Sequence, residues 1–428
     1  MIPLSHLLLA LIVGISIVLM LVRPRDIPEV YWIAGGVLLL LLLRLVPLNL
    51  AGRAAAKALD VCLFLIGMMV LSELAREHGV FDWISSVAVR SARGSCSRLF
   101  ALTYAVGTVV TILMSNDATA VVLTPAILTA VRKAKVEPLP YLFVCAFVAN
   151  AASFLLPISN PANLVVFHDH MPPLGKWLLS FAVPSVLSIG ETFLVMRWIF
   201  RKELSASIEC QVEAKTLQSD GKLVLGGLVL VVAVLLTASS LGKDLGLPTC
   251  LAALAITAVV SVKARNNPIA LFREISWETL ALVAGLFVMV DAIESIGAMR
   301  LTTEWLVWAE RLGTTVGTFI IGFAVGVANN LVNNLPLGLI VGSTLQTVHA
   351  RGLIADAALI GVDLGPNLSI TGSLATILWL IALRKEGLHV SFWDFLKMGA
   401  VAMPVALLAS LAGAILMQSH SFHQLLHH

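Results

Sequence analysis

The stretch MSNDATAVVLTP (residues 114–125) lies in the middle of an apolar segment that extends from about residue 99 to residue 131. Three consecutive polar residues, Ser115, Asn116 and Asp117, interrupt that segment halfway along its length. Polar and ionisable side chains are costly inside a bilayer, and those that occur there usually serve a function. The stretch therefore predicts that the segment turns back at this point and exposes a polar tip.

The composition is that of a membrane protein. Of the 428 residues, 59% are hydrophobic and 12% are charged, against roughly 25% charged residues in soluble domains. Apolar runs of about 20 residues, the length that crosses a bilayer, recur along the whole chain. We therefore predict an all-α polytopic membrane protein embedded in the lipid bilayer, and the net charge of +3 gives no reason to expect a nucleic-acid partner.

Other functional classes lack their sequence signals. The chain contains no GxxxxGK[ST] phosphate-binding loop and no nucleophile–base pair at membrane depth, so we expect neither an enzyme nor a cofactor. Transport would have to be driven by an ion gradient or by a separate subunit. The C-terminal HQLLHH (423–428) could bind a metal ion, but a solvated tail is the simpler interpretation. The five cysteines form no CxxC pair and no metal-ligand spacing with histidine; they are Cys62, Cys96, Cys145, Cys210 and Cys250.

Ten spans are predicted, five in each half of the chain. The first apolar run has no basic residue before it and no cleavage site after it, so we expect a first span rather than a signal peptide. The spans are 7–22, 30–48, 59–75, 139–167 and 177–199, then 223–241, 248–262, 276–296, 354–383 and 392–417. Two further apolar segments, 99–131 and 313–350, have polar centres. The expected organisation is a first repeat (1–199), a flexible cytoplasmic linker (200–222), a second repeat (223–419) and a His-rich tail (420–428).

The two halves resemble each other in sequence. GMMVLSELAREHGVFDW (67–83) aligns with GLFVMVDAIESIGAMRL (285–301), and SNPANL (159–164) aligns with TGSLAT (371–376). Asn116 and Asp117 fall over Asn333 and Asn334. Because five spans per half is an odd number, the second repeat must be inverted in the membrane. Inverted repeats with interrupted helices at the midplane are characteristic of secondary transporters.

The distribution of Lys and Arg tests this topology. If both polar-centred segments turn back, 20 of the 28 Lys and Arg residues lie on the side reached after the first span, whereas single crossings give 15 against 13. Cytoplasmic loops carry the excess of Lys and Arg, which favours turning back, with both termini outside the inner (plasma) membrane. Each arm has roughly 15 residues, about 22 Å at 1.5 Å per residue. That length predicts re-entrant hairpins whose tips, near Asn116 and Asn333, approach each other.

Four polar stretches at membrane depth mark the candidate site, and Gly or Pro residues break three of them. They are MSNDATA (114–120), NAASFLLPISNPAN (150–163), NNLVNNLP (329–336) and GVDLGPNLSITGS (361–373). Backbone that such breaks leave unpaired is tolerated at membrane depth only against protein or a water-filled cavity. Alternatively, the Asn and Ser side chains only cap the helix ends at each break. The candidate substrate-binding residues are Ser115, Asn116, Asn160, Asn163, Asn333, Asn334, Asn367, Thr371 and Ser373.

Asp117 and Asp363 are the only carboxylates in these stretches, and no Lys or Arg lies beside them. Burial without a cation disfavours the charged form of a carboxyl, so both are candidate proton-coupling residues that could share a proton if they face each other. The alternative role for Asp117 and Asp363 is to cap a helix N-terminus. Glu73 and Asp291 lie near span ends, and their alternative role is to extend toward the membrane interface. A lining of Asn, Ser, Thr and backbone fits a small neutral hydroxylated solute or a bare cation, although helix N-termini could also hold an anion.

Three of these stretches resemble the bacterial arsenite/antimonite efflux permeases of the ion transporter superfamily. They are MSNDATAVVLTPAI, NNLVNNLPLGLIVGS and GVDLGPNLSITGSLATILWL (361–380), of which the last is the most specific. The resemblance implies export of As(OH)3 and Sb(OH)3 in exchange for protons, and optional association with a cytosolic arsenite-stimulated ATPase subunit. Related dicarboxylate and Na+/H+ transporters carry Ser-Asn-Thr at their tips. The tips differ here, which disfavours a dicarboxylate, but a Na+/H+ or organic-anion transporter of the same fold remains the alternative.

The cysteine pattern agrees with a transporter of hydroxylated arsenic. Clustered thiolates capture As(III) tightly, whereas a transporter must release what it binds. A neutral trihydroxide that is hydrogen-bonded by Asn, Ser, Thr and carbonyl groups would leave readily. We therefore predict that the five cysteines are dispensable for transport.

Overall fold

The computed structural model describes residues 3–168, 171–208, 216–265 and 269–418, and the regular elements within these ranges are helices. The predicted all-α class is confirmed. The His-rich tail at 420–428 and Cys210 lie outside the described residues.

Both halves of the chain contain the same elements in the same order. The first half comprises α1 (Leu4–Val22), α2 (Glu29–Leu42), α3 (Leu48–Glu77), α4 (Val80–Ser91), α5 (Cys96–Leu113), α6 (Thr124–Lys133), α7 (Leu139–Ala151), α8 (Pro161–Val166) and α9 (Leu174–Ile199). The second comprises α10 (Ser219–Ser240), α11 (Gly246–Ala264), α12 (Ile269–Glu274), α13 (Trp277–Ser295), α14 (Arg300–Arg311), α15 (Thr314–Val332), α16 (Asn334–Thr347), α17 (Leu353–Leu364), α18 (Leu374–Lys385) and α19 (Phe392–Gln418). Among the α-helices of the described ranges, only the six-residue α12 lacks a counterpart.

Short turns of other helix types occupy the breaks. A π-helical segment, η2 (Ala118–Leu123), precedes α6, and the 3-10 turns η3 (Pro157–Ser159), η5 (Gly365–Asn367) and η6 (Ile370–Gly372) interrupt the two predicted broken spans. Two further 3-10 turns, η1 (Pro24–Asp26) and η4 (Glu203–Ser205), lie in loops. Part of the predicted linker is attached to the protein, because the Ile208 amide donates to the Gly94 carbonyl at 2.8 Å.

Eight of the described helices are long and apolar enough to cross a membrane. A ninth candidate is the pair α13 and α14, which is bent by 81° between its two helices. The eight include the hairpin arms α5 and α15, whereas the shorter α2 and α7 fall below the required length. A multi-pass membrane protein is therefore confirmed.

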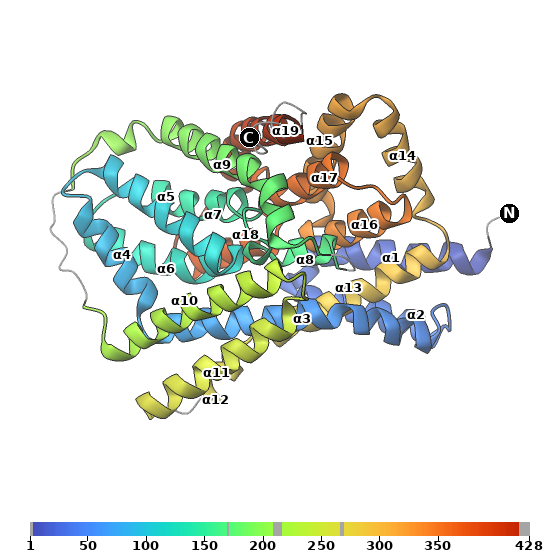
Figure 1. Ribbon diagram of the computed structural model, residues 1–428, viewed down its shortest axis with the longest axis horizontal. Coiled ribbons are helices and arrows are strands. Elements are labelled where there is room, and N and C mark those ends of the chain that lie inside the picture. Colours follow the sequence, from blue (N-terminus) through green and yellow to red (C-terminus); the bar gives the residue numbers. More distant parts are fainter. Residues whose placement is uncertain (1–2, 169–170, 209–215, 266–268, 419–428) are drawn as a thin grey trace.

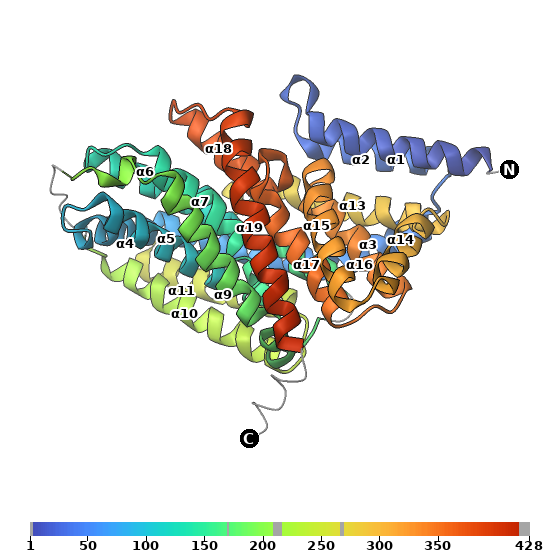
Figure 2. The same ribbon diagram turned by 90° about the horizontal axis from the view of Figure 1, so that it is seen from above.

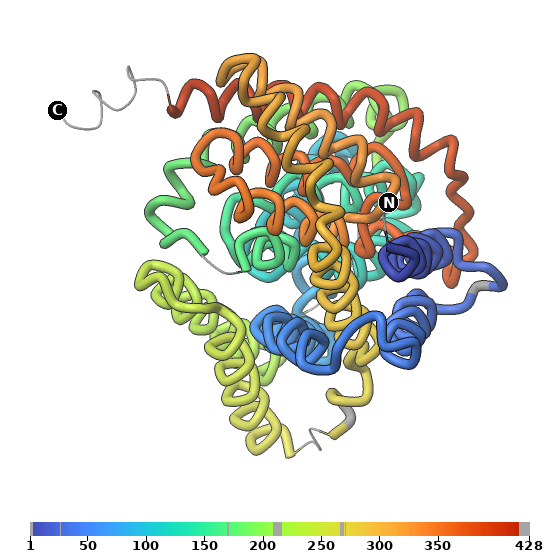
Figure 3. The backbone as a smooth tube through the Cα atoms, turned by 90° about the vertical axis from the view of Figure 1, so that its right-hand side faces the viewer, coloured from blue at the N-terminus to red at the C-terminus, as the bar shows by residue number. Residues whose placement is uncertain are grey.

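The helices form two bundles that lie side by side. In the first bundle, α3 packs against α11 and α13, α13 packs against α2, and α10 packs against α11; Figure 1 shows these helices along the lower side of the molecule, and Figure 3 shows them from the end. Gly246 allows α11 to approach α3, because a Cβ there would lie 2.1 Å from the Asp60 carbonyl oxygen. The Asp60 side chain in turn accepts the Gly246 amide at 2.8 Å.

The second bundle holds the hairpins, the broken spans, α9 and α19. In it α5 packs against α7, α15 against α17, and α9 against α19, and Figure 2 shows the last pair next to each other. The Ser410 hydroxyl on α19 donates to the carbonyl of Pro184 on α9 at 3.1 Å. Across the two halves, the Trp379 indole donates to the Leu142 carbonyl at 3.0 Å. This bundle therefore joins equivalent elements of both halves around a common core.

Both polar-centred segments turn back on themselves, as predicted. After the first one, the Tyr141 hydroxyl near the start of α7 donates to the carbonyl of Cys96, the first residue of α5, at 3.3 Å. In the second one, Val325 of α15 and Val341 of α16 line the same cavity, which places the two arms side by side. In each segment, the part after the polar tip therefore packs beside the part before it.

Two amphipathic helices, α4 and α14, were not predicted. They precede the hairpins in the first and second half, and each begins three to five residues after a long helix of the first bundle. Their sequences carry charges at Asp82, Arg90, Arg300 and Arg311, and they lie outside the predicted spans.

Candidate functional site

The two broken spans cross, and buried side chains join them at the crossing. The Asn160 amide group, between η3 and α8, donates to the Asp363 carboxylate at the end of α17. The Asn150 amide group on α7 donates to the Asn367 side-chain oxygen in η5 at 3.0 Å. Asp363 and Asn367 are fully buried, and Asn150 and Asn160 are 1% exposed. Each pair links one half of the protein to the other.

Asn160 has a second bond that fixes the local backbone. Its side-chain oxygen accepts the Ala162 amide at 3.0 Å and so caps the start of α8. Ser373 caps α18 in the same way, because its hydroxyl accepts the Thr376 amide at 3.1 Å. The two helices therefore begin at capped breaks in both halves, at positions 213 residues apart.

Asp363 has no cation beside it among the described residues. One carboxylate oxygen accepts from Asn160, and the other is buried without a hydrogen-bond partner. The Ser153 hydroxyl donates instead to the Asn150 carbonyl at 2.7 Å. A buried polar atom that is left unpaired costs free energy. The hydrogen bond from Asn160 therefore offsets part of the free-energy cost of burying the Asp363 carboxyl.

The second hairpin is attached to the second break by Asn side chains. Asn330 on α15 donates to the Gly365 carbonyl at 3.0 Å and accepts from the Ser369 hydroxyl at 2.7 Å. The Thr371 hydroxyl donates to the Asn330 carbonyl at 2.9 Å. Asn333, at the tip, has a φ of 77° and donates to the Thr371 carbonyl at 3.3 Å. This tip is thereby held on the backbone of the break.

The first hairpin tip has a different construction. The Ser115 hydroxyl accepts the Ala118 amide at 3.1 Å, and the Asn116 side-chain oxygen accepts the Asp117 amide at 3.0 Å. Just beyond the tip, the Thr111 and Thr119 hydroxyls bond each other across the hairpin at 2.8 Å. Because Ser115 and Asn116 bond the local backbone, Asp117 is left as the residue of the tip whose polar side-chain atoms make no hydrogen bond or ion pair in the described ranges.

A cavity of about 150 Å³ adjoins this tip. Polar residues of the first bundle, among them Ser72 and Glu73 on α3, line it opposite Ser115 and Asp117. The first residues of α8 and α18 also line it, so two helix N-termini border the same space. The remaining polar lining residues are Glu274, Ser276 and Thr279. Three carboxylates and no Lys or Arg therefore line the cavity.

The structure brings some of the predicted residues together and separates others. Ser115 and Asp117 line the cavity, whereas Asn116 is 2% exposed and does not. Asp363 is bonded to Asn160, and no hydrogen bond joins it to Asp117 among the described residues, so a proton shared by these two carboxyls stays a prediction. The two tips are separated by Leu374, which lines both this cavity and a small second one at Asn333 and Thr371.

Other predicted residues connect segments of backbone. Asn163 donates to the Ser153 carbonyl at 2.9 Å and so closes the loop of the first break, and Asn367 donates to the Phe147 carbonyl at 3.1 Å. The Asn334 side-chain oxygen is buried without a partner among the described residues.

The two acidic residues predicted near span ends, Glu73 and Asp291, are each paired with a cation. Glu73 accepts from the Arg76 guanidinium at 2.7 Å, and Asp291 accepts from Lys57 at 3.3 Å. Sequence analysis missed Asn330 and Glu274 as individual candidates. The doubled NN in NNLVNN carried a signal for Asn330, whereas Glu274, the last residue of α12, lies between two predicted spans in a segment without such a signal.

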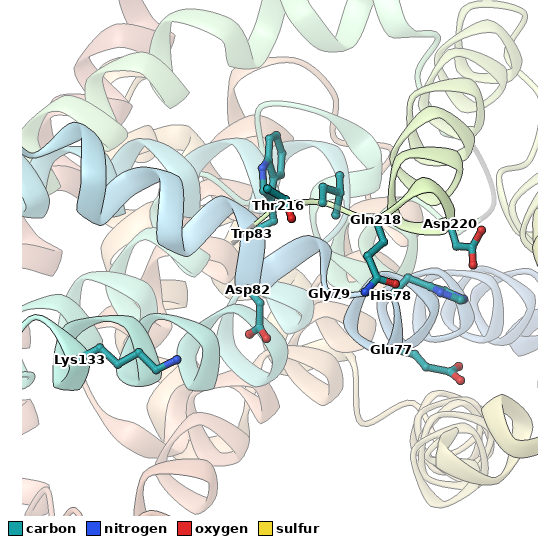
Figure 4. A pocket seen from close by; sticks show the side chains of 11 residues that line it. Glu77, His78, Gly79, Asp82, Trp83, Lys133, Thr216, Gln218 and Asp220 are labelled. Carbon is teal, nitrogen blue, oxygen red and sulfur yellow. The ribbon is translucent and has the colours of Figure 1, made fainter. Parts of the chain in front are cut away.

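A larger, open cavity of about 700 Å³ lies where α3, α4, α6 and α10 meet (Figure 4). Its lining carries both signs of charge: Glu77, Asp82 and Asp220 are acidic, and Figure 4 shows Lys133 on α6 extending toward Asp82 on α4. None of the predicted site residues lines it. The candidate site is therefore the smaller cavity at the hairpin tip.

Comparisons with known proteins agree with a transporter of this construction. The sequence profile of a family described as citrate transporter matches residues 17–361. The chain belongs to this family. An arsenical pump membrane protein of Escherichia coli K12 is 26% identical over 430 residues, covering 95% of this chain and 91% of the relative. The corresponding protein of Yersinia enterocolitica is 25% identical over 365 residues, covering 82% and 85%.

Two further comparisons extend this result. An uncharacterized transporter of Mycobacterium tuberculosis is 24% identical over 375 residues, covering 81% of this chain and 83% of the relative. The crystal structure of the Alcanivorax borkumensis YdaH transporter, described as having an unusual topology, superimposes with a TM-score of 0.59 at 14% identity. It covers 97% of this chain and 98% of that one. The resemblance to arsenite permeases inferred from the motifs is confirmed by the curated relatives, and the polytopic fold by the crystal structure.

Proposed function

We propose that this membrane transporter exports arsenite and antimonite, as the neutral trihydroxides As(OH)3 and Sb(OH)3, in exchange for protons. The observation that carries the proposal is the cavity at the first hairpin tip, whose polar lining is hydroxyls and carboxylates without Lys or Arg. The names of the curated relatives support arsenic as the substrate element.

The cavity suits a solute that both donates and accepts hydrogen bonds. The hydroxyl protons of a trihydroxide would be donated to the Asp117 carboxylate, which has no partner of its own in the described ranges. The oxygen atoms of the trihydroxide would face the N-terminus of α18, where the helix dipole favours negative charge. A bulky polyanion would gain from that dipole but would be repelled by Asp117 and Glu274, whereas the charge of Glu73 is balanced by Arg76.

Proton exchange follows if substrate and proton compete for the same carboxyl. A protonated Asp117 can no longer accept a hydroxyl proton with both of its oxygen atoms, so protonation from outside weakens the hold on the trihydroxide. Release of the proton to the cytoplasm restores the site. Asp363 contributes differently in this scheme, because it holds the two broken spans together through Asn160.

We assign the cavity to the cytoplasmic side on the distribution of charge. Glu73 lies one turn before Arg76, and the Lys/Arg-rich loops predicted to be cytoplasmic include the end of α3. The same rule gives inner-membrane insertion with both termini outside and the 200–222 linker in the cytoplasm. Alkaline phosphatase fusions to the termini should be active, and a fusion within the linker should be inactive.

Accumulation of arsenite in inside-out vesicles tests the function directly. With an acidic lumen and no ATP, vesicles carrying the protein should concentrate arsenite, and dissipation of the pH gradient should abolish the uptake. Uptake that requires ATP and a cytosolic ATPase would contradict autonomous proton exchange and support the optional subunit. Flux that no gradient drives uphill would indicate a channel.

Transport of an organic anion is the second candidate, because the family profile is described as citrate transporter. The acidic cavity disfavours it, since a tricarboxylate would meet the carboxylates of Asp117 and Glu274. Labelled citrate uptake, and competition of citrate with arsenite, separate the two, and sodium dependence would instead indicate Na+ coupling. Citrate transport at a rate similar to that of arsenite would overturn the proposal.

A further inference from the structure

An apolar cavity of about 250 Å³ lies behind the second hairpin, away from the candidate site. It lies between α14 on one side and α15, α16 and α17 on the other, and it is partly open to the surroundings. Its apolar lining includes Trp305, Leu306, Val325, Ala328, Leu337 and Val341. Apolar cavities of about 150 Å³ stay dry and bind small hydrocarbons. A larger cavity of this kind therefore suits a hydrocarbon chain.

The polar groups in this cavity are already satisfied. The Thr302 and Thr344 hydroxyls lie 2.8 Å apart, and each also donates to a backbone carbonyl of its own helix, at 2.8 Å and 2.7 Å. No carboxylate, Lys or Arg lines the cavity. It therefore offers a ligand apolar contact alone.

The position of α14 shows where such a ligand would come from. The axis of α14 is bent by 81° from that of α13. Because α13 covers the span predicted at 276–296, this bend directs α14 along the membrane surface, where amphipathic interfacial helices lie. Trp305 faces the apolar cavity, and Trp308, 50% exposed, lies in the neighbouring surface depression. Trp residues at that level are typical of the lipid headgroup boundary.

A cation lies at the end of the same helix. Arg311 lines the surface depression next to Trp308 and Thr347, and its guanidinium forms no ion pair among the described residues. The nearest acidic residue of that depression, Glu304, is bonded to Arg300 at 2.6 Å. Arginine binds phosphate well because its fork of N–H groups matches the phosphate oxygens. The apolar cavity and the depression that holds Arg311 are both lined by residues of α14 and α16, so these two helices offer the two parts that a phospholipid requires, an apolar space and a cation.

We propose that a membrane phospholipid binds here, with one acyl chain between α14 and the second hairpin and its phosphate at Arg311. The occupant would brace the hairpin arms, because Val325 and Leu337 from the two arms both contact the space that it fills. This site lies apart from the substrate cavity, and the proposal does not depend on which solute is transported.

Native mass spectrometry of the purified, delipidated full-length protein tests this site with added phosphatidylglycerol. One phospholipid should remain bound per chain. Ala328→Phe, which fills the cavity, should remove it, whereas Leu331→Phe, on the exposed face of the same helix, should not. Arg311→Gln should weaken binding about tenfold, the loss expected for one charge-assisted hydrogen bond.

Lipids with brominated acyl chains give a second measurement, which does not require a substitution that fills the cavity. In nanodiscs, the fluorescence contributed by Trp305, taken as the difference between the parent and Trp305→Phe, should be quenched at a low mole fraction of brominated lipid. The difference signal of the exposed Trp198 should fall only in proportion to that fraction. Equal quenching of both, or lipid retention that is unchanged in Ala328→Phe and Arg311→Gln, would overturn the proposal.

Discussion

Replacing Asn160 should destabilise the protein more than the loss of a helix cap does. Asn160→Ala removes the donor to Asp363 and also the acceptor for the Ala162 amide. Loss of an N-cap costs about 1 kcal/mol, and a buried acceptor left without its donor costs about 1–3 kcal/mol. The free energy of unfolding should therefore fall by about 2–4 kcal/mol.

The second repeat supplies a matched control. Ser373→Ala removes the corresponding cap of α18 without touching a carboxyl, so it should cost about 1 kcal/mol. Unfolding can be followed by tryptophan fluorescence as dodecyl sulfate is titrated into dodecyl maltoside micelles. A double-mutant cycle of Asn160→Ala with Asp363→Asn should give a coupling energy of about 1 kcal/mol or more.

Two results would refute this account of the crossing. One is an equal cost for Asn160→Ala and Ser373→Ala, which would mean that the Asp363 contact adds nothing to the cap. The other is strict additivity in the cycle, which would mean that the two side chains do not interact. Either result would mean that the Asn160–Asp363 contact does not help to join the broken spans.

Three other outcomes are expected. Asp117→Asn should abolish pH-driven arsenite accumulation in inside-out vesicles but change the free energy of unfolding by less than about 0.5 kcal/mol, because the side chain makes no contact that is lost; retained accumulation would place the proton elsewhere. A cysteine at 117 should react with a membrane-impermeant thiol reagent from the cytoplasmic side, and arsenite should slow the reaction, whereas a cysteine at the buried position 116 should react far more slowly. Replacing all five cysteines with Ala or Ser should leave arsenite resistance largely intact. If the replacement of one cysteine abolishes resistance while the protein is still inserted at normal levels, hydroxyl recognition is contradicted.

The sequence predicted the long elements closely because apolar length and Gly/Pro breaks are local signals. The span expected at 177–199 is the helix Leu174–Ile199, and the span expected at 392–417 is Phe392–Gln418. The broken spans were also recognised, since Pro157 and Pro366 interrupt apolar runs that are otherwise long enough to cross. In each case the physical cause of the element lies within the segment itself.

The amphipathic helices were missed for a physical reason. α4 and α14 are short and carry charges, and they are stabilised by packing against the hairpins that follow them. Charge-bearing segments between spans also fit ordinary loops. Their helical character depends on neighbours that only the folded structure supplies.

The orientation of the polar residues at the breaks could not be predicted either. A sequence shows that Asn116, Asn160 and Ser115 lie at membrane depth, but not whether each faces a cavity or the adjacent backbone. In the structure, one residue can both cap a helix and line the cavity, so the two roles do not exclude each other. Ser115 does cap, and it also lines the cavity, whereas Asn160 caps and holds a carboxyl.

The differences between the two halves locate the chemistry within a repeated framework. Equivalent positions carry different groups: Asp117 aligns with Asn334 in sequence, and Asp363 and Asn150 are each the last residue but one of the equivalent helices α17 and α7. The first half thus supplies a carboxylate at its hairpin tip, and the second half supplies one at its break. A repeat alone would give two equal sites, whereas this exchange of Asp for Asn leaves one carboxyl in contact with a cavity and buries the other in the link between the halves. We infer that substrate and proton meet at the first tip, and that the crossing keeps the two broken spans in register while they do so.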